Sequence, residues 1–154
     1  MTATNGVSVF VQNHAGRKGV PQRMSFENWI RAIPDLRRRR VQINLLTVGI
    51  SEGKRFNRNF RKRDYATNVL SFSYAPVPGE KKTWLLGDLV ICSPVVAREA
   101  AEQGKPLRNH YAHLTIHGVL HLLGYDHKTT VEASVMEARE TRILAALGIP
   151  DPYA

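Results

Sequence analysis

The chain has 154 residues, which is the usual length of one domain and enough to bury a hydrophobic core. Apolar residues make up 43% of the sequence and charged residues 23%, a balance typical of a folded globular domain. The formal net charge is +9, and no apolar run approaches the roughly 20 residues of a membrane-spanning helix, so no such helix is expected.

The first part of the chain predicts strands and helices in alternation. Short β-rich or alternating runs indicate the strands, and a serine before a periodic apolar stretch indicates the start of each helix. In chain order we expect a strand at 7–11, a helix capped by Ser25 that ends near Pro34, a strand within 40–50, and a basic helix capped by Ser51 that reaches about Phe60.

The second part of the chain predicts two more strands and then only helices. Glycine after a periodic segment marks a helix end, and proline in the first turn marks a start. We expect strands at 67–74 and 84–91 joined by the turn-rich segment APVPGE, a helix from Ser93 to Gly104, a helix over 107–123 ended by Gly124, and a last helix with a Thr129–Glu132 capping box that ends at Gly148.

About four strands, most of them early, and about five helices, concentrated late, predict an α+β fold with helices packed on a mixed sheet. No linker divides the sequence, so we expect residues 1–154 to form a single domain. The order of the strands does not follow from the pattern. Cys92 is the only cysteine and the start of the chain lacks the features of a secretory signal, so we expect a cytoplasmic protein without an internal disulfide.

The positive charge is concentrated in one part of the sequence. Residues 37–64 contain ten lysines and arginines against two acidic residues, whereas residues 110–154 contain three against five. This skew predicts a polyanionic partner, because neutralised phosphates release counterions and strengthen binding. The charge alone does not separate a ribosome, free nucleic acid and an anionic membrane, and a merely solubilising basic surface is the alternative.

Three histidines in the segment HGVLHLLGYDH predict a catalytic metal site. His117 and His121 are four residues apart and therefore lie on one face of the expected helix. Gly124 can end that helix and reverse the chain, which allows His127 to return as a third ligand. Three protein ligands and one open position are typical of catalytic zinc, whereas a structural zinc ion usually has four ligands.

A second set of histidines competes for the same role. His113, His117 and His121 follow one another at steps of four, and His110 stands just before them. Eight residues of helix span about 12 Å, so imidazoles at the two ends cannot both reach an ion that binds at about 2.1 Å. We therefore expect His110 and His113 to be core or groove residues. Asp126 is expected either to orient an imidazole or to be a solvated turn residue.

The residue after the first histidine argues against a peptidase. The spacing resembles that of the metzincin proteases, which have a glutamate as general base at the position of Gly118. Glycine cannot accept a proton, so a peptidase would need a carboxylate from elsewhere, such as Asp88 or Glu99. Zinc is the default ion for three neutral imidazoles, although nickel, iron and manganese remain open.

Three segments of the sequence resemble the YbeY endoribonucleases, also called ribosomal RNA maturation factors. They are HGVLHLLGYDH, FRKRDYATNVLSF (60–72) and LLGDLVIC (85–92), and the similarity extends over nearly the whole chain. Members commonly have proline where this chain has Ala66 and Ser73, which changes local backbone stiffness but none of the expected ligands.

The resemblance implies a metal-dependent hydrolase fold and a single-strand-specific, zinc-dependent endoribonuclease. It also implies a role in maturation of the 3′ end of small-subunit ribosomal RNA and in ribosome quality control, with the ribosome or its small subunit as partner. By position, His117, His121 and His127 are the implied zinc ligands, and the functionally important arginine falls on Arg61. A planar guanidinium there could bind phosphate at two points.

Two other functions stay open at this point. The chain could be a ribosome-assembly protein that binds RNA without cutting it and carries a structural metal. It could also be a metallopeptidase, a function that only the histidine spacing favours.

Overall fold

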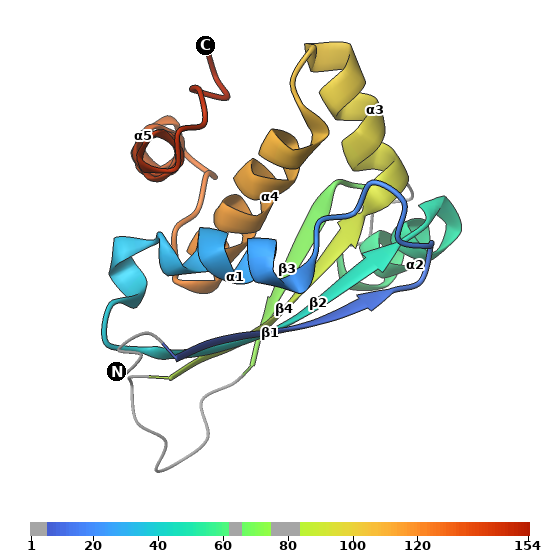
Figure 1. The fold of residues 1–154 in the computed structure, drawn as a ribbon, viewed down its shortest axis with the longest axis horizontal. Coiled ribbons are helices and arrows are strands. Elements are labelled where there is room, and N and C mark those ends of the chain that lie inside the picture. Colours follow the sequence, from blue (N-terminus) through green and yellow to red (C-terminus); the bar gives the residue numbers. More distant parts are fainter. Residues whose placement is uncertain (1–5, 62–65, 75–83) are drawn as a thin grey trace.

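The computed structural model describes residues 6–61, 66–74 and 84–154 (Figure 1). The strands are β1 (Gly6–Asn13), β2 (Arg40–Val48), β3 (Val69–Ser73) and β4 (Trp84–Cys92). The helices are α1 (Arg23–Arg31), the short 3₁₀ turn η1 (Pro34–Leu36), α2 (Ile50–Arg61), α3 (Ser93–Gln103), α4 (Leu107–Leu122) and α5 (Thr130–Ala146). The expected segment APVPGE lies outside the described residues.

The four strands form one mixed sheet in the order β1-β2-β4-β3. β1 pairs parallel with β2 and β2 pairs parallel with β4, whereas β3 pairs antiparallel with β4 along one edge. A parallel pair needs a crossover connection, and α1 supplies it between β1 and β2. The prediction of an α+β fold with a mixed sheet and about five helices is confirmed.

Alternate residues of the central strands face two separate hydrophobic clusters. Leu45 and Leu89 belong to the larger cluster, together with apolar residues of α1, α4 and α5. Leu46 and Val90 point the other way, into a smaller cluster that includes Phe56 of α2. Helices α1 and α4 accordingly lie over one face of the sheet and α2 lies on the opposite side (Figure 1).

Two glycines let α4 approach the sheet closely. A Cβ atom on Gly87 of β4 would lie 2.6 Å from Cδ1 of Leu122, and one on Gly118 of α4 would lie 2.8 Å from Cδ2 of Leu89. Real Cβ atoms do not tolerate such contacts without movement of the neighbour. The helix that carries two of the candidate ligands is therefore packed directly against β3 and β4.

Two of the predicted helix starts are wrong. Ser25 lies inside α1, whose N-cap is Gln22, and its Oγ accepts a hydrogen bond of 2.9 Å from Nη1 of Arg108. Ser51 lies inside α2, because the amide of Gly53 already donates to the carbonyl of Gly49 at 2.9 Å. In both cases the serine is preceded by residues that already adopt the helical hydrogen-bonding pattern.

The other helix boundaries agree with the sequence patterns. The capping box at the start of α5 is present, with the Thr129 side chain accepting from the amide of Glu132 and the Glu132 side chain accepting from the amide of Thr129. Gly104 and Gly124 follow α3 and α4 with φ angles of 64° and 105°, which glycine adopts most readily. Within the described ranges, no helix combines the length and apolar character that crossing a membrane requires.

Candidate metal centre

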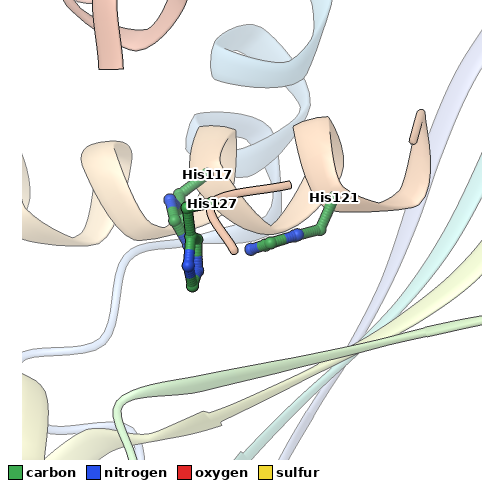
Figure 2. Close-up of side chains that lie close together, drawn as sticks. All are labelled: His117, His121 and His127. Carbon is green, nitrogen blue, oxygen red and sulfur yellow. The ribbon is translucent and has the colours of Figure 1, made fainter. Parts of the chain in front are cut away.

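Three histidine side chains converge where α4 ends and the chain reverses (Figure 2). His117 and His121 are one turn apart on α4, and His127 lies in the loop between α4 and α5. The reversal begins at Gly124, whose amide donates to the carbonyl of His121, while the amide of Tyr125 donates to the carbonyl of Leu120. The helix end thus returns the chain so that His127 faces the two helical histidines.

The geometry of the three imidazoles fits a divalent transition metal. One ring nitrogen from each residue lies within 4.8 Å of the others, and the ring centroids are 4.7 to 5.6 Å apart. A tetrahedral ion with bonds of about 2.1 Å keeps its ligands about 3.4 Å apart, so small movements of the rings complete the site. Three protein nitrogens leave one position open for a substrate or water.

A buried carboxylate fixes the ring of His117. Nδ1 of His117 lies 2.7 Å from Oε2 of Glu140, which comes from α5. An ionised carboxylate can only accept a hydrogen bond, so the proton of the neutral imidazole is on Nδ1 and Nε2 is the free ligand atom. Histidines that bind metals commonly donate their second ring N–H to a carboxylate in this way.

Glu140 is the centre of a wider hydrogen-bond network. Its Oε1 accepts from Nε2 of His113 at 2.7 Å and from the hydroxyl of Tyr153, and none of its side chain is exposed to solvent. Burial alone would raise the pKa of Glu140, but the hydrogen bonds from His113, His117 and Tyr153 outweigh it and lower the pKa to about 2. Glu140 is therefore a buried anion directly behind His117.

The surroundings of His121 favour its neutral form. Burial lowers the pKa of His121, and the neighbouring His117 and His127 lower it further. Since only an unprotonated nitrogen binds a metal ion, a lowered pKa favours metal binding by His121.

The loop that carries His127 is fixed to the rest of the domain by Tyr125. The hydroxyl of Tyr125 donates to Oδ2 of Asp35 at 2.8 Å, and Oδ1 of Asp35 accepts from Nε and Nη2 of Arg139 at 3.1 and 2.5 Å. Asp126, which could have been an orienting partner, instead accepts from the backbone amide of His127 at 2.8 Å. It therefore stabilises the turn.

The two other histidines of α4 lie outside the cluster, as predicted from the length of the helix. His110 and His113 are buried, with 3% and 8% of their surfaces exposed. His110 pairs with Glu99 at 2.9 Å, and His113 contributes to the network of Glu140. His113 thus contacts the site indirectly, through the carboxylate that it shares with His117.

The structure provides no room for a protease-like glutamate after the first histidine. Gly118 is buried, a side chain there would meet Leu89 of β4, and its carbonyl accepts a hydrogen bond of 3.0 Å from Ser71. Of the two carboxylates considered as substitutes, Glu99 pairs with His110 and Asn68, and Asp88 accepts from Asn44 and Tyr74. Both carboxylates are therefore paired with residues outside the cluster of His117, His121 and His127.

Arg61 is the last residue of α2, and its side chain lies outside the described part of the chain. The helix that leads to it is basic on its surface, where Lys54, Arg55 and Arg58 are exposed.

Two carboxylates that hold the candidate site in place, Glu140 and Asp35, were not predicted from the sequence. Glu140 carried a signal, because it is the one charged residue on a face of α5 otherwise formed by Met136, Ile143 and Leu144. A carboxylate on an apolar helix face needs a buried partner. Asp35 carried no comparable signal, since it is 90 residues away from Tyr125 in the sequence.

The mixed sheet, the close packing of α4 and the three converging imidazoles define an α+β protein with a site of the type used by metal-dependent hydrolases. The family model described as "Endoribonuclease YbeY" matches residues 11–148. Curated proteins of that name from Stenotrophomonas maltophilia and Xanthomonas campestris pv. campestris are each 55% identical to the chain over 141 residues, which is 90% of the chain and 88% of each relative. The chain belongs to the YbeY endoribonuclease family.

A solved structure supports the fold alone. The solution structure of a protein from Thermotoga maritima superposes with a TM-score of 0.54 at 19% identity, over 92% of this chain and 91% of the other.

Proposed function

We propose that the chain is an endoribonuclease that acts in ribosomal RNA processing, and that His117, His121 and His127 bind its metal ion. The observation that carries this proposal is the convergence of three imidazole nitrogens within 4.8 Å in a chain whose relatives are named endoribonucleases. The formal net charge of +9 supports an RNA substrate, because a basic protein attracts phosphate.

We further propose that the metal is zinc. Three neutral imidazoles and an open fourth position suit zinc, although other divalent transition metals share this preference. When bound, the ion supplies a Lewis acid beside the scissile phosphate. Glu140 orients His117 toward the ion, and the partly buried His121 stays unprotonated.

Arg61 is proposed as the catalytic arginine. Its planar guanidinium would bind two phosphate oxygens and stabilise negative charge that develops on them. Its place at the end of a basic helix supports this role, since the exposed Lys54 and Arg55 on α2 would attract the same RNA strand.

The finer features of the function are expectations from family membership. We propose a preference for single-stranded RNA, because unpaired backbone bends into a pocket more easily than a duplex. We also propose that the substrate is the 3′ end of small-subunit ribosomal RNA, that the small subunit is the partner, and that the protein contributes to ribosome quality control. A cytoplasmic location follows from that substrate.

The test uses a labelled single-stranded ribosomal RNA fragment. Wild type is expected to cleave it, and a chelator is expected to abolish cleavage. His121→Ala, purified identically, is expected to lose both metal and cleavage. Arg61→Ala is expected to keep the metal and to lose cleavage at least about a hundredfold, as removal of a charge-stabilising group does.

The outcomes separate the remaining functions. Equal cleavage by wild type and folded His121→Ala would contradict the proposal and indicate a contaminating ribonuclease. Tight RNA binding without cleavage by any preparation would favour an assembly protein with a structural metal. Cleavage of casein that a chelator inhibits would favour a peptidase, against which the packing of Gly118 argues.

A further inference from the structure

Two neighbouring residues of α5 reach two different ligands of the candidate metal centre. Glu140 contacts His117 directly, with 2.7 Å between Oε2 and Nδ1. Arg139 holds Asp35, and Asp35 holds Tyr125, which lies two residues before His127. We propose that Arg139 and Glu140 are positioning residues of the site: Glu140 fixes the ring of His117, and Arg139 fixes the loop of His127 through Asp35 and Tyr125. This inference rests on the proposed metal-binding function.

The first set of contacts, which we call the Glu140 branch, holds the ring of His117 in one orientation. The carboxylate is completely buried, and both of its oxygens are occupied, one by His117 and the other by His113 and Tyr153. A carboxylate held by two donors from α4 and one from the segment after α5 cannot rotate without loss of hydrogen bonds. Its position is therefore fixed before a metal arrives, and the lone pair on Nε2 of His117 points in one direction.

The second set of contacts, the Arg139 branch, runs from Arg139 through Asp35 to Tyr125. It is needed because His127 is on a loop. His127 is the exposed member of the three histidines, so packing contributes little to its position. The Tyr125 hydroxyl holds the loop to Asp35 at 2.8 Å, and two nitrogens of Arg139 hold the same carboxylate. The loop of the third ligand is thereby fastened to the helix that also fixes the first ligand.

The two branches predict different losses of metal affinity. In metal-free protein titrated with Zn²⁺ against a chromophoric chelator, Glu140→Gln is expected to weaken zinc binding about 10- to 100-fold, the usual effect of losing a carboxylate behind a ligand histidine. Tyr125→Phe removes one hydroxyl and is expected to weaken zinc binding about fivefold, the equivalent of one hydrogen bond. Arg142→Gln, at an exposed position of α5, is the control and is expected to bind as wild type does.

A second background separates positioning from general stability. In His127→Ala protein, Tyr125→Phe has no ligand left to position and is expected to weaken zinc binding no further, whereas Glu140→Gln is expected to keep its effect through His117. Thermal unfolding of each metal-free variant reports any loss of stability separately. If Glu140→Gln does not fold, Glu140→Asp, which withdraws the carboxylate by one methylene, takes its place.

Three results would overturn the inference. Folded Glu140 or Tyr125 variants could bind zinc as tightly as wild type does, or the loss caused by Tyr125→Phe could persist undiminished in the His127→Ala background. Wild type could also bind no zinc at all, which would refute both this inference and the proposed metal. Zinc binding that depends on both branches, in a wild type that cleaves no RNA, would support the inference and refute only the proposed endoribonuclease.

Discussion

Gly118 shows how one residue separates the candidate site from that of a protease with the same histidine spacing. The position after His117 faces the sheet, where a Cβ atom would lie 2.8 Å from Leu89 and 3.2 Å from Ser71. Neither an acidic side chain nor a methyl group can be added there without displacing the core. The absence of a glutamate is thus part of the way in which α4 packs on β3 and β4.

Gly118→Glu is expected to destabilise the fold and to create no peptidase. The substitution overfills a packed region and buries a carboxylate, so we expect the free energy of unfolding to fall by at least about 3 kcal/mol. Urea denaturation measures this change. Ala138→Glu, which adds the same side chain at an exposed position of α5, is the control and is expected to stay within about 0.5 kcal/mol of wild type. Equal stability of the two variants would contradict the packing argument.

At the scale of elements, Asp35 joins three parts of the chain. It belongs to η1, accepts from Tyr125 in the loop after α4, and forms an ion pair with Arg139 of α5. Burial alone would raise the pKa of Asp35, but hydrogen bonds from Arg139 and Tyr125 outweigh burial and lower the pKa from its ordinary value of 3.8. The folded protein therefore favours the ionised carboxylate.

The lowered pKa of Asp35 predicts a stability that depends on pH. In the unfolded chain Asp35 binds its proton at a higher pH than in the folded protein, so its contribution is complete above about pH 5 and is lost as the pH falls below 3.8. We expect Asp35→Asn to be less stable than wild type at pH 6, and the difference to shrink towards pH 3. Urea denaturation of the metal-free proteins at both values measures it.

Glu102→Gln, which removes an exposed carboxylate of α3, is the control for this experiment and is expected to follow the pH profile of wild type. A difference between Asp35→Asn and wild type that stays constant from pH 6 to pH 3 would show that the Asp35 carboxylate contributes nothing through its charge.

Elements with local signals were predictable and their spatial order was not. The Thr129–Glu132 capping box and Gly124 depend on neighbours within a few residues, and both function as predicted. Ser25 carried an equally good local signal, but tertiary contact with Arg108 on another helix uses its hydroxyl. The insertion of β4 between β2 and β3 depends on pairing over long sequence separations, which no local pattern encodes.

The same distinction applies to the candidate site. The spacing of His117, His121 and His127 in one segment made their convergence predictable, because a helix turn and a glycine reversal determine it. The residues that hold these histidines in place come from elsewhere in the chain. Glu140 is 23 residues from His117, and its role depends on how α5 packs.

On the scale of the whole molecule, the uneven charge predicts how RNA binding responds to salt. Lys54 and Arg55 of α2 are exposed and are two of the basic residues that give the chain its net charge of +9. Each phosphate contact on single-stranded RNA contributes about 0.7 to the slope of log affinity against log salt concentration. If both side chains contact phosphate, Lys54→Gln combined with Arg55→Gln is expected to reduce the magnitude of that slope by about 1.4.

Fluorescence anisotropy with a labelled single-stranded RNA, from 50 to 300 mM salt, measures this slope. Arg142→Gln on α5 removes one positive charge away from the basic segment, and we expect it to leave the slope close to that of wild type. An identical slope for wild type and the double variant would exclude this surface of α2 from RNA binding.

The place of α5 after the histidines also affects the order in which the site forms during synthesis. The chain is synthesised from its N-terminus, so His117, His121 and His127 are added before Arg139 and Glu140. Until α5 has been made and has packed, the ring of His117 lacks its carboxylate and Tyr125 lacks the arginine that fixes Asp35. A nascent chain therefore carries all three histidines before it can hold them in place.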